Sequence, residues 1–313
     1  MSVVRANRLE LDFQVHGDLS APPLLLVMGL GMPAALWPDE FVAALVSKGF
    51  RVVTFDNRDC GGSTRLAGVP TPHAGRAILR SLLRLPVSAP YTLEDMATDT
   101  AGLLDAIGVD RAHIVGASMG GMISQMLAAR HPRRVLSLTS IMSNSGNPNR
   151  RYAFGKWKAL GAITRPPPPP DDHAAVVEHL AFVFSVIGSP DFRDNLPQLK
   201  PILERVARRG LYREGTERQL LAILATGDRR ALLRGITAPA LILHGADDPL
   251  VPPAAGRDTA DCIPGASFEL VPGMGHDFPP TLMARLALRI AEHCRAAERF
   301  STPASMATGT VAA

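Results

Sequence analysis

Residues 112–121 read AHIVGASMGG, an apolar run that leads into a serine with glycines two positions before and two positions after it. This G-x-S-x-G pattern, formed by Gly116, Ser118 and Gly120, is typical of a sharp turn from a buried strand into a helix. Glycine is needed at the flanking positions because a Cβ atom would clash within the turn. The turn presents the hydroxyl beside the first free N–H groups of the helix, where negative charge is stabilised. The stretch therefore predicts a nucleophile at Ser118.

The residues around the turn favour the same interpretation, which matters because an isolated G-x-S-x-G string is most often a plain turn. Residues 113–115 are typical of the end of a buried strand. Apolar residues then recur at the spacing of one helix face, at Met122, Ile123, Met126 and Leu127. Pro132 ends this helix because the residue before a proline avoids helical dihedrals.

Strand and helix patterns alternate on both sides of the turn. Strands are predicted at residues 9–15, 23–28, 51–55, 135–142, 239–243 and 267–271, in addition to the one that ends at residues 113–115. Helices are predicted at residues 36–48, 76–85, 92–107, 119–131, 254–263 and 281–296, the third beginning with the capping-box pair Thr92 and Asp95. The alternation predicts an α/β fold with a mostly parallel central sheet and helices on both faces.

The alternation stops after residue 143, where a helical insertion is predicted. Helical patterns occur near residues 151–161, 172–187, 196–209 and 216–225, and a stiff run of five prolines separates the first two. We interpret the insertion as a cap over the carboxyl edge of the sheet. Its apolar residues Trp157, Phe182, Phe184 and Val186 are expected either to line a substrate pocket or to pack against the cap's own helices.

These patterns divide the chain into four segments. The first part of the core is predicted at residues 1–143, the cap at 144–235, and the second part of the core at 236–299. Residues 300–313 hold little apolar surface to bury and are predicted to form a disordered tail.

A serine nucleophile needs a base and a carboxylate that orients the base. Asp248 and His276 each follow a predicted strand, at the sheet edge that also carries Ser118, because all strands of a parallel sheet end on one side. Asp247 is a rival for the acid, but Pro249 restrains its neighbour Asp248, which we favour. We interpret His276 as the base because it lies in a glycine-flanked loop after the final strand. The other histidines considered are His113 and His131, interpreted as structural, and His73, His173, His179 and His293, interpreted as surface residues.

The loop after the strand at residues 23–28 is expected to complete the site. The backbone N–H groups of Leu30 and Met119 are the two candidate donors to an oxyanion, each typically contributing about 3 kcal/mol to transition-state stabilisation. Residues 29–34 also begin like a dinucleotide-binding loop, but a proline in the loop makes this a poor cofactor site, and no cofactor is expected. Asp56, Arg58 and Asp59 are interpreted as a loop brace in which the arginine satisfies its neighbours locally.

Composition limits the remaining classes of function. The chain has 313 residues, an apolar share of 46%, a net charge of +4 and scattered arginines, which argues against nucleic-acid binding. Its three cysteines lack metal-ligand spacing, so no metal site is expected. No signal peptide and no long apolar run is visible, so we expect a cytoplasmic protein without a membrane partner.

Five ordered motifs, LLLVMG, FDNRDCGGST, GASMGG, LILHGADDPLVP and PGMGH, resemble those of the α/β-hydrolase family. The resemblance implies that Asp248 is the acid of the triad and supports Leu30 and Met119 as the oxyanion pair. LLLVMG, WPDEF, DNRDCGGST and PGMGH together are similar to the bacterial aclacinomycin methylesterase-like hydrolases, which remove the methyl group of a polyketide ester.

The favoured function is a serine carboxylic-ester hydrolase that acts through an acyl-enzyme on a small to medium, fairly apolar ester. A polyketide methylesterase is the first alternative. The same triad serves thioesterases, C–C bond hydrolases, proline iminopeptidases and perhydrolases, and a hydrolase-fold ligand-binding protein is the alternative outside enzymes. The expected partner is a small-molecule ester, and the sequence does not predict an oligomeric state.

Overall fold

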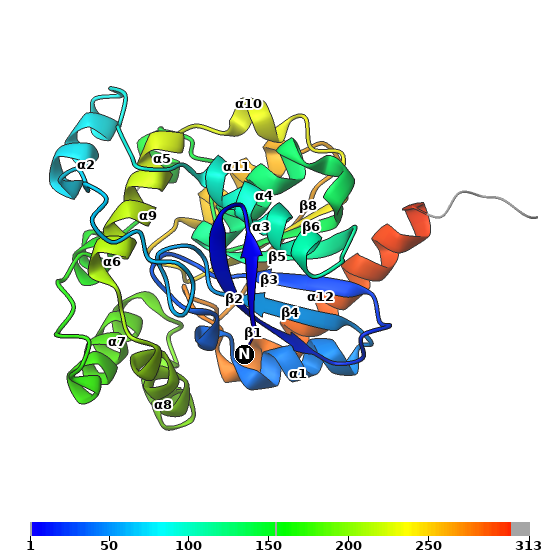
Figure 1. Cartoon of the computed structure of the whole chain (residues 1–313), viewed down its shortest axis with the longest axis horizontal. Helices are drawn as coiled ribbons and strands as arrows, with labels where there is room; N and C mark the ends of the chain where they lie inside the picture. Colours follow the sequence, from blue (N-terminus) through cyan, green and yellow to red (C-terminus); the bar gives the residue numbers. More distant parts are fainter. Residues whose placement is uncertain (1, 154, 302–313) are drawn as a thin grey trace, which may run out of the picture.

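The structure is a computed structural model that describes residues 2–153 and 155–301, so most of the tail predicted at 300–313 lies outside the described residues. Its centre is an eight-stranded sheet in the order β1-β2-β4-β3-β5-β6-β7-β8 (Figure 1). β1 (Ser2–Ala6) and β2 (Leu9–His16) form an antiparallel edge. The six strands that follow are parallel to one another: β3 (Pro23–Val27), β4 (Arg51–Phe55), β5 (Ala112–Ala117), β6 (Val135–Ile141), β7 (Ala240–Gly245) and β8 (Ser267–Val271). The predicted fold class, with a mostly parallel sheet, is confirmed.

Helices cover both faces of the sheet (Figure 1). α3 (Leu93–Ala106), α4 (Met119–Arg130) and α11 (Pro253–Cys262) pack on one face, and α1 (Asp39–Ser47) and α12 (Pro280–Ser301) pack on the other. Successive side chains of a strand point to opposite faces, so Leu25 and Val27 join the first core and Leu24 and Leu26 join the second. Burial on both faces is why the parallel strands are continuous apolar runs rather than alternating ones.

Local signals in the sequence placed several element ends correctly. Thr92 caps α3, and its hydroxyl and the Asp95 side chain form both bonds of the capping box. The sequence analysis did not predict the edge strand β1, the helix α10 (Arg230–Leu233) or the two 3₁₀ turns. The remaining short elements are the 3₁₀ turns η1 (Ala34–Leu36) and η2 (Pro132–Arg134) and the helix α2 (Ala74–Leu82).

The described residues between β6 and β7 form six helices, and we call residues 144–235 the helical insertion. They are α5 (Arg150–Ala153), α6 (Trp157–Ile163), α7 (His173–Ile187), α8 (Phe192–Arg209), α9 (Arg213–Thr226) and α10. The single helix predicted near residues 151–161 is wrong, because the chain leaves helical geometry between α5 and α6. There the Lys156 N–H donates to the carbonyl of Pro249 at 2.7 Å, and a Cβ atom on Gly155 would lie 2.2 Å from the Leu250 oxygen. A contact with the loop after β7 therefore interrupts the helix.

Candidate active site

Ser118 occupies a strained turn between β5 and α4. Its φ of +55° and ψ of −119° lie in a region that residues other than glycine rarely adopt. A Cβ atom on Gly116 would lie 2.2 Å from the Gly120 oxygen, and one on Gly120 would lie 2.0 Å from the Val27 oxygen. Both glycines are therefore required for the close packing of β5, α4 and β3 that holds the serine at the sheet edge.

Three side chains form a continuous hydrogen-bonded chain at this edge. His276 Nε2 lies 3.0 Å from Ser118 Oγ, and His276 Nδ1 lies 2.8 Å from Asp248 Oδ2. The second carboxylate oxygen of Asp248 accepts the N–H groups of Leu250 and Val251 at 2.8 and 2.9 Å. The structure thus brings together the three predicted residues, although 158 positions separate the serine from the histidine.

The environment of Asp248 keeps its carboxylate ionised. Burial alone would raise its pKa, but the neighbouring His276 and His244 hold the pKa of Asp248 well below its usual range. The rival Asp247 is exposed and accepts the Gly273 N–H at 3.0 Å instead. Asp248 is therefore the carboxylate that contacts His276.

Sequence reasoning missed a second imidazole beside Asp248. His244 is fully buried, and its Nε2 lies 3.0 Å from the Val251 carbonyl oxygen and 3.5 Å from Asp248 Oδ2. A Cβ atom on Gly256 would lie 2.3 Å from His244 Nδ1, so this side chain is tightly enclosed. The available signal was the H-G-x-x-D string. Its first residue, His244, lies at the end of β7, four positions before Asp248, and this spacing brings the two side chains together.

The loop that carries His276 is held by the helical insertion. The His276 N–H donates to the Ile187 carbonyl at 2.8 Å, and the Gly275 N–H donates to Ser189 Oγ at 2.9 Å. Both the backbone N–H and the hydroxyl of Ser189 donate to Asp277 Oδ1. Burial raises the pKa of Asp277 to about 6, against these hydrogen bonds. Ser189, just after α7, therefore contacts both neighbours of the histidine, which sequence spacing did not indicate.

The two predicted oxyanion donors flank the serine. A Cβ atom on Gly29 would lie 3.2 Å from Ser118 Cβ, so the loop with Leu30 runs directly beside the nucleophile, and Met119 begins α4. Gln219 of α9 fixes this loop by accepting the Gly31 N–H at 2.7 Å. The backbone around Leu30 is thus held between the core and the helical insertion.

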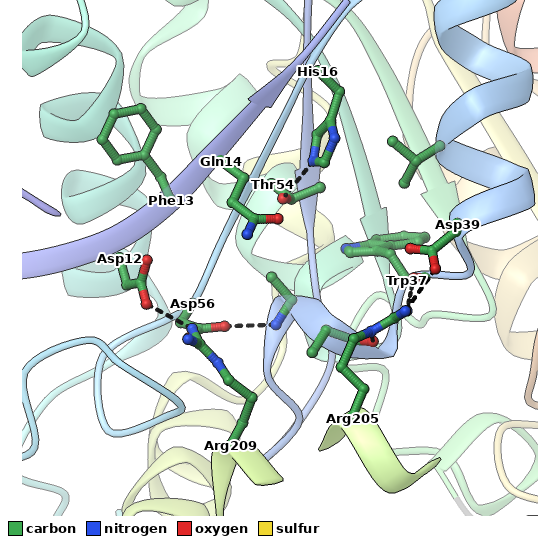
Figure 2. A pocket seen from close by; sticks show the side chains of 13 residues that line it. Asp12, Phe13, Gln14, His16, Trp37, Asp39, Thr54, Asp56, Arg205 and Arg209 are labelled. Atoms are coloured by element: carbon green, nitrogen blue, oxygen red, sulfur yellow. Dashed lines mark hydrogen bonds and ion pairs between the residues drawn. The ribbon is translucent and has the colours of Figure 1, made fainter. Parts of the chain in front are cut away.

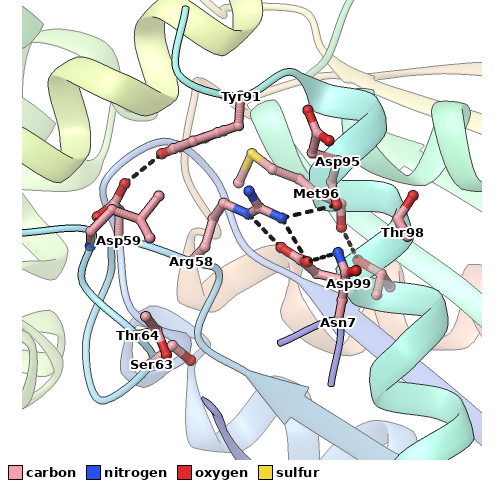
Figure 3. Close-up of polar contacts among 12 residues, drawn as sticks. Asn7, Arg58, Asp59, Ser63, Thr64, Tyr91, Asp95, Met96, Thr98 and Asp99 are labelled. Atoms are coloured by element: carbon pink, nitrogen blue, oxygen red, sulfur yellow. Dashed lines mark hydrogen bonds and ion pairs between the residues drawn. The ribbon is translucent and has the colours of Figure 1, made fainter. Parts of the chain in front are cut away.

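The expectation that Arg58 satisfies its two aspartate neighbours locally is wrong. Arg58 instead donates to Asp99 of α3, with Nη2 2.7 Å from Oδ1, and its guanidinium lies 4.8 Å from the centre of the Tyr91 ring (Figure 3). Asp59 accepts the Tyr91 hydroxyl at 2.9 Å and both Nε and Nη2 of Arg218 at 2.8 Å. Successive side chains of this loop point away from one another, so each finds a partner distant in sequence.

The other aspartate of the loop also contacts the helical insertion. Asp56 accepts the Ala34 N–H at 2.6 Å and pairs with Arg209 of α8, which donates to Asp12 at 2.7 Å as well (Figure 2). One turn earlier on α8, Arg205 donates to Asp39 at 2.6 Å. Arginines on α8 and α9 therefore tie the insertion to the core through carboxylates.

The three residues predicted for a substrate pocket have different surroundings. Trp157 is 79% exposed, and Phe182 is 42% exposed beneath the guanidinium of Arg165. Phe184 stacks on Phe192 at 5.9 Å within the insertion. Of the two alternatives, packing within the insertion describes the surroundings of Phe184.

His293 is buried, so its interpretation as a surface residue is wrong. It is 9% exposed, its Nε2 lies 3.2 Å from the Leu138 oxygen, and burial lowers its pKa to about 4. The long helix α12 places it against β6, a contact that its polar neighbours in the sequence did not reveal.

The described part of the chain shows neither a metal site nor a membrane-spanning helix. Within residues 2–153 and 155–301, no group of three or more histidine, cysteine or acidic side chains is placed to hold a metal ion. Over the same ranges, no helix has the length and apolar character needed to cross a membrane.

The chain matches a known protein family. Residues 22–280 match the family described as alpha/beta hydrolase fold, and the chain belongs to it. The chain is 31% identical to rhodomycin D methylesterase of Streptomyces sp. (strain C5) and 30% identical to that of Streptomyces peucetius, over 90% of this chain and 93% of each relative. The chain is thus a hydrolase of the α/β family that resembles methylesterases.

Solved structures show the same fold. The enol-lactonase from Burkholderia xenovorans LB400 is 25% identical, with a TM-score of 0.67 over 96% of this chain and 100% of that one. The meta-cleavage product hydrolase from Pseudomonas fluorescens IP01, at 17% identity, has a TM-score of 0.74 over 95% of this chain and 98% of its own.

Proposed function

We propose that this protein is a serine carboxylic-ester hydrolase that acts through an acyl-enzyme. The observation that carries the proposal is the hydrogen-bonded chain of Ser118, His276 and Asp248 at a strained strand-to-helix turn. This is the arrangement that makes a serine hydroxyl nucleophilic, because the imidazole accepts its proton and the carboxylate stabilises the imidazolium that forms.

In the proposed reaction, Ser118 Oγ attacks the ester carbonyl as His276 Nε2 takes the hydroxyl proton. The N–H groups of Leu30 and Met119 donate to the oxyanion of the tetrahedral intermediate. The imidazolium then gives its proton to the leaving alkoxide, and an alcohol departs. Water, activated by the same imidazole, attacks the acyl-enzyme, and the carboxylic acid leaves with the serine restored.

The substrate we favour is the methyl ester of a polycyclic carboxylic acid, with methanol as the alcohol released. The choice of a methyl ester rests on the names of the two rhodomycin D methylesterases to which the chain is about 30% identical over most of its length. The choice of a polycyclic acid rests on the resemblance of the sequence motifs to those of polyketide methylesterases. In this proposal the helical insertion is a cap over the site, with the boundaries 144–235, and the flanking segments 1–143 and 236–299 form the catalytic core.

Hydrolysis of p-nitrophenyl esters from acetate to palmitate, and of methyl esters of polycyclic acids, tests the proposal. Ser118→Ala is expected to lower kcat by about 10⁴-fold or more. Ser20→Ala is the matched control, because Ser20 is exposed and its hydroxyl bonds only within its own turn, to Asp18 at 2.8 Å. Hydrolysis that survives in Ser118→Ala would contradict the mechanism, and a folded native protein with no multiple turnover would favour a binding function.

A further inference from the structure

Helix α2 carries a surface that the hydrolase site does not use. The helix lies at the outer edge of the molecule beside α9 (Figure 1). Three leucines at its carboxyl end face solvent, Leu79 and Leu82 in the helix and Leu83 at its C-cap, with exposed fractions of 57%, 53% and 62%. We define the α2 surface as Arg76, Leu79, Arg80, Leu82, Leu83, Arg84 and Leu85, all of them exposed.

The exposed residues of α2 are sorted by type around the helix. Leucines at 79, 82 and 83 follow the i, i+3, i+4 spacing of one face, and Arg76 and Arg80 are four residues apart on the adjacent face. The face toward the protein is a third one, marked by the buried Ala77. The leucine stripe is therefore not the stripe that attaches α2 to the protein.

The surroundings of this stripe are basic. Between Asp59 and Glu94 the sequence holds Arg65, Arg76, Arg80 and Arg84 and no acidic residue. The Arg80 Nε–H donates to the Pro86 carbonyl at 2.7 Å, an interaction that leaves its charge in place. On the neighbouring α9, Glu217 pairs with Arg213 of its own helix at 3.1 Å. The exposed leucines thus lie beside a cluster of positively charged arginines.

We propose that the α2 surface binds the surface of an anionic lipid bilayer. A leucine stripe flanked by arginines is the pattern of a helix that lies in the plane of the interface, with its apolar face among the acyl chains and its cations at the lipid phosphates. At 1.5 Å per residue the helix is roughly 13 Å long, which suits this orientation and is too short to span the bilayer. The sequence analysis expected no membrane partner because no segment is long enough to span a bilayer, and the proposal departs from that expectation.

Two other occupants fit the surface less well. A symmetric pair of chains would place the same patch on itself, so that arginines would face arginines without an intervening acid. A stable protein partner normally covers about 800 Å² on each side, more than one short helix at the molecular edge offers. A bilayer needs only a shallow amphipathic segment.

The helix is already formed and anchored, so association would not require folding of α2. His73 caps it by accepting the Gly75 N–H at 3.1 Å, and Arg218 of α9 donates to Thr71 Oγ1 at 3.0 Å just before the helix. Preorganisation lowers the entropy lost on association.

Co-sedimentation of the full chain with vesicles tests the proposal. We expect binding to vesicles of phosphatidylglycerol and phosphatidylcholine, weakened by salt, and little binding to phosphatidylcholine alone. The double variant Leu79→Ser/Leu83→Ser is expected to bind about tenfold or more weakly, and Arg76→Gln/Arg80→Gln to lose the preference for anionic vesicles. Leu19→Ser is the matched control, since Leu19 is 70% exposed and lies far from α2 in sequence.

Circular dichroism and p-nitrophenyl acetate hydrolysis would show that each variant is folded. No binding of the native chain to the anionic vesicles would overturn the proposal, as would equal losses in the α2 and Leu19 variants. Self-association that Leu83→Ser abolishes would instead identify a second copy as the partner, and binding to polyglutamate without vesicle binding would indicate an acidic protein.

Discussion

Two buried aspartates in this molecule have opposite kinds of partner. Asp59 is bonded through both of its oxygens to Arg218, and Asp248 is bonded to His276. A guanidinium keeps its proton throughout the working pH range, so its ion pair holds two segments together without chemistry. An imidazole exchanges its proton near neutral pH, so the carboxylate beside it can support proton transfer. The partner, rather than burial or charge, distinguishes the structural Asp59 from Asp248, which we propose to be catalytic.

Asp277 adds a third case, a buried carboxylate whose hydrogen bonds come from Ser189. Its pKa is raised to about 6, because burial disfavours the charge more than two hydrogen bonds and the nearby His276 favour it. Asp248, whose Oδ2 lies near the imidazoles of His276 and His244, has its pKa lowered instead. Substitution of each of these three aspartates is therefore expected to change a different property of the protein.

The largest effect is expected at the imidazole-paired aspartate. Asp248→Asn keeps the shape but removes the charge that stabilises the imidazolium, so kcat should fall by about 10⁴-fold. Steady-state ester hydrolysis measures this, with Asp247→Asn as the matched control on the adjacent residue. An equal loss in both variants would contradict the assignment of the acid.

At the arginine-paired aspartate the effect should fall on stability. Asp59→Asn leaves the buried Arg218 without its carboxylate, which is expected to lower the free energy of unfolding by about 3–5 kcal/mol. Urea denaturation measures the loss. The double variant Asp59→Asn/Arg218→Met should recover part of this stability, because no unpaired charge remains. If the loss in the double variant equals the sum of the losses in Asp59→Asn and in Arg218→Met, the pair is not coupled.

For Asp277 the expected signature is a pH dependence of stability. A carboxylate whose folded pKa is raised from 3.8 to about 6 holds its proton more tightly in the folded state. Its contribution is therefore fully present below pH 3.8 and is lost as the pH rises through about 6. Asp277→Asn should remove this loss and raise the stability at pH 8 by about 2–3 kcal/mol relative to the native chain. If the difference in stability between the native chain and Asp277→Asn is the same at pH 4 and pH 8, the raised pKa is contradicted.

The smallest effect is expected where the insertion positions His276 through its neighbours. Ser189→Ala removes the hydroxyl bonds to Asp277 and Gly275, which should lower kcat/KM about tenfold, the equivalent of about 1.4 kcal/mol, with KM little changed. Ser189→Thr, which retains a hydroxyl, should restore part of the rate. Ser185→Ala is the control, because the Ser185 hydroxyl bonds only within α7, to the Phe182 carbonyl at 2.8 Å.

Much of the core was predictable because its signals are local. A serine between spaced glycines, the Thr92 and Asp95 capping box and the apolar strand runs each depend on residues a few positions apart. The order of Ser118, Asp248 and His276 was informative for a related reason, since parallel strands bring the residues after them to one edge whatever their separation.

Only the tertiary structure decided the partners of the buried polar groups. Asp59 and Arg218 are 159 positions apart, and Ser189 and Asp277 are 88 apart, so no local spacing indicates either pair. The burial of His293 depends likewise on where α12 crosses the sheet. A buried charge must find a partner, but chain geometry at the scale of the whole fold selects which one, and the sequence near that charge does not encode it.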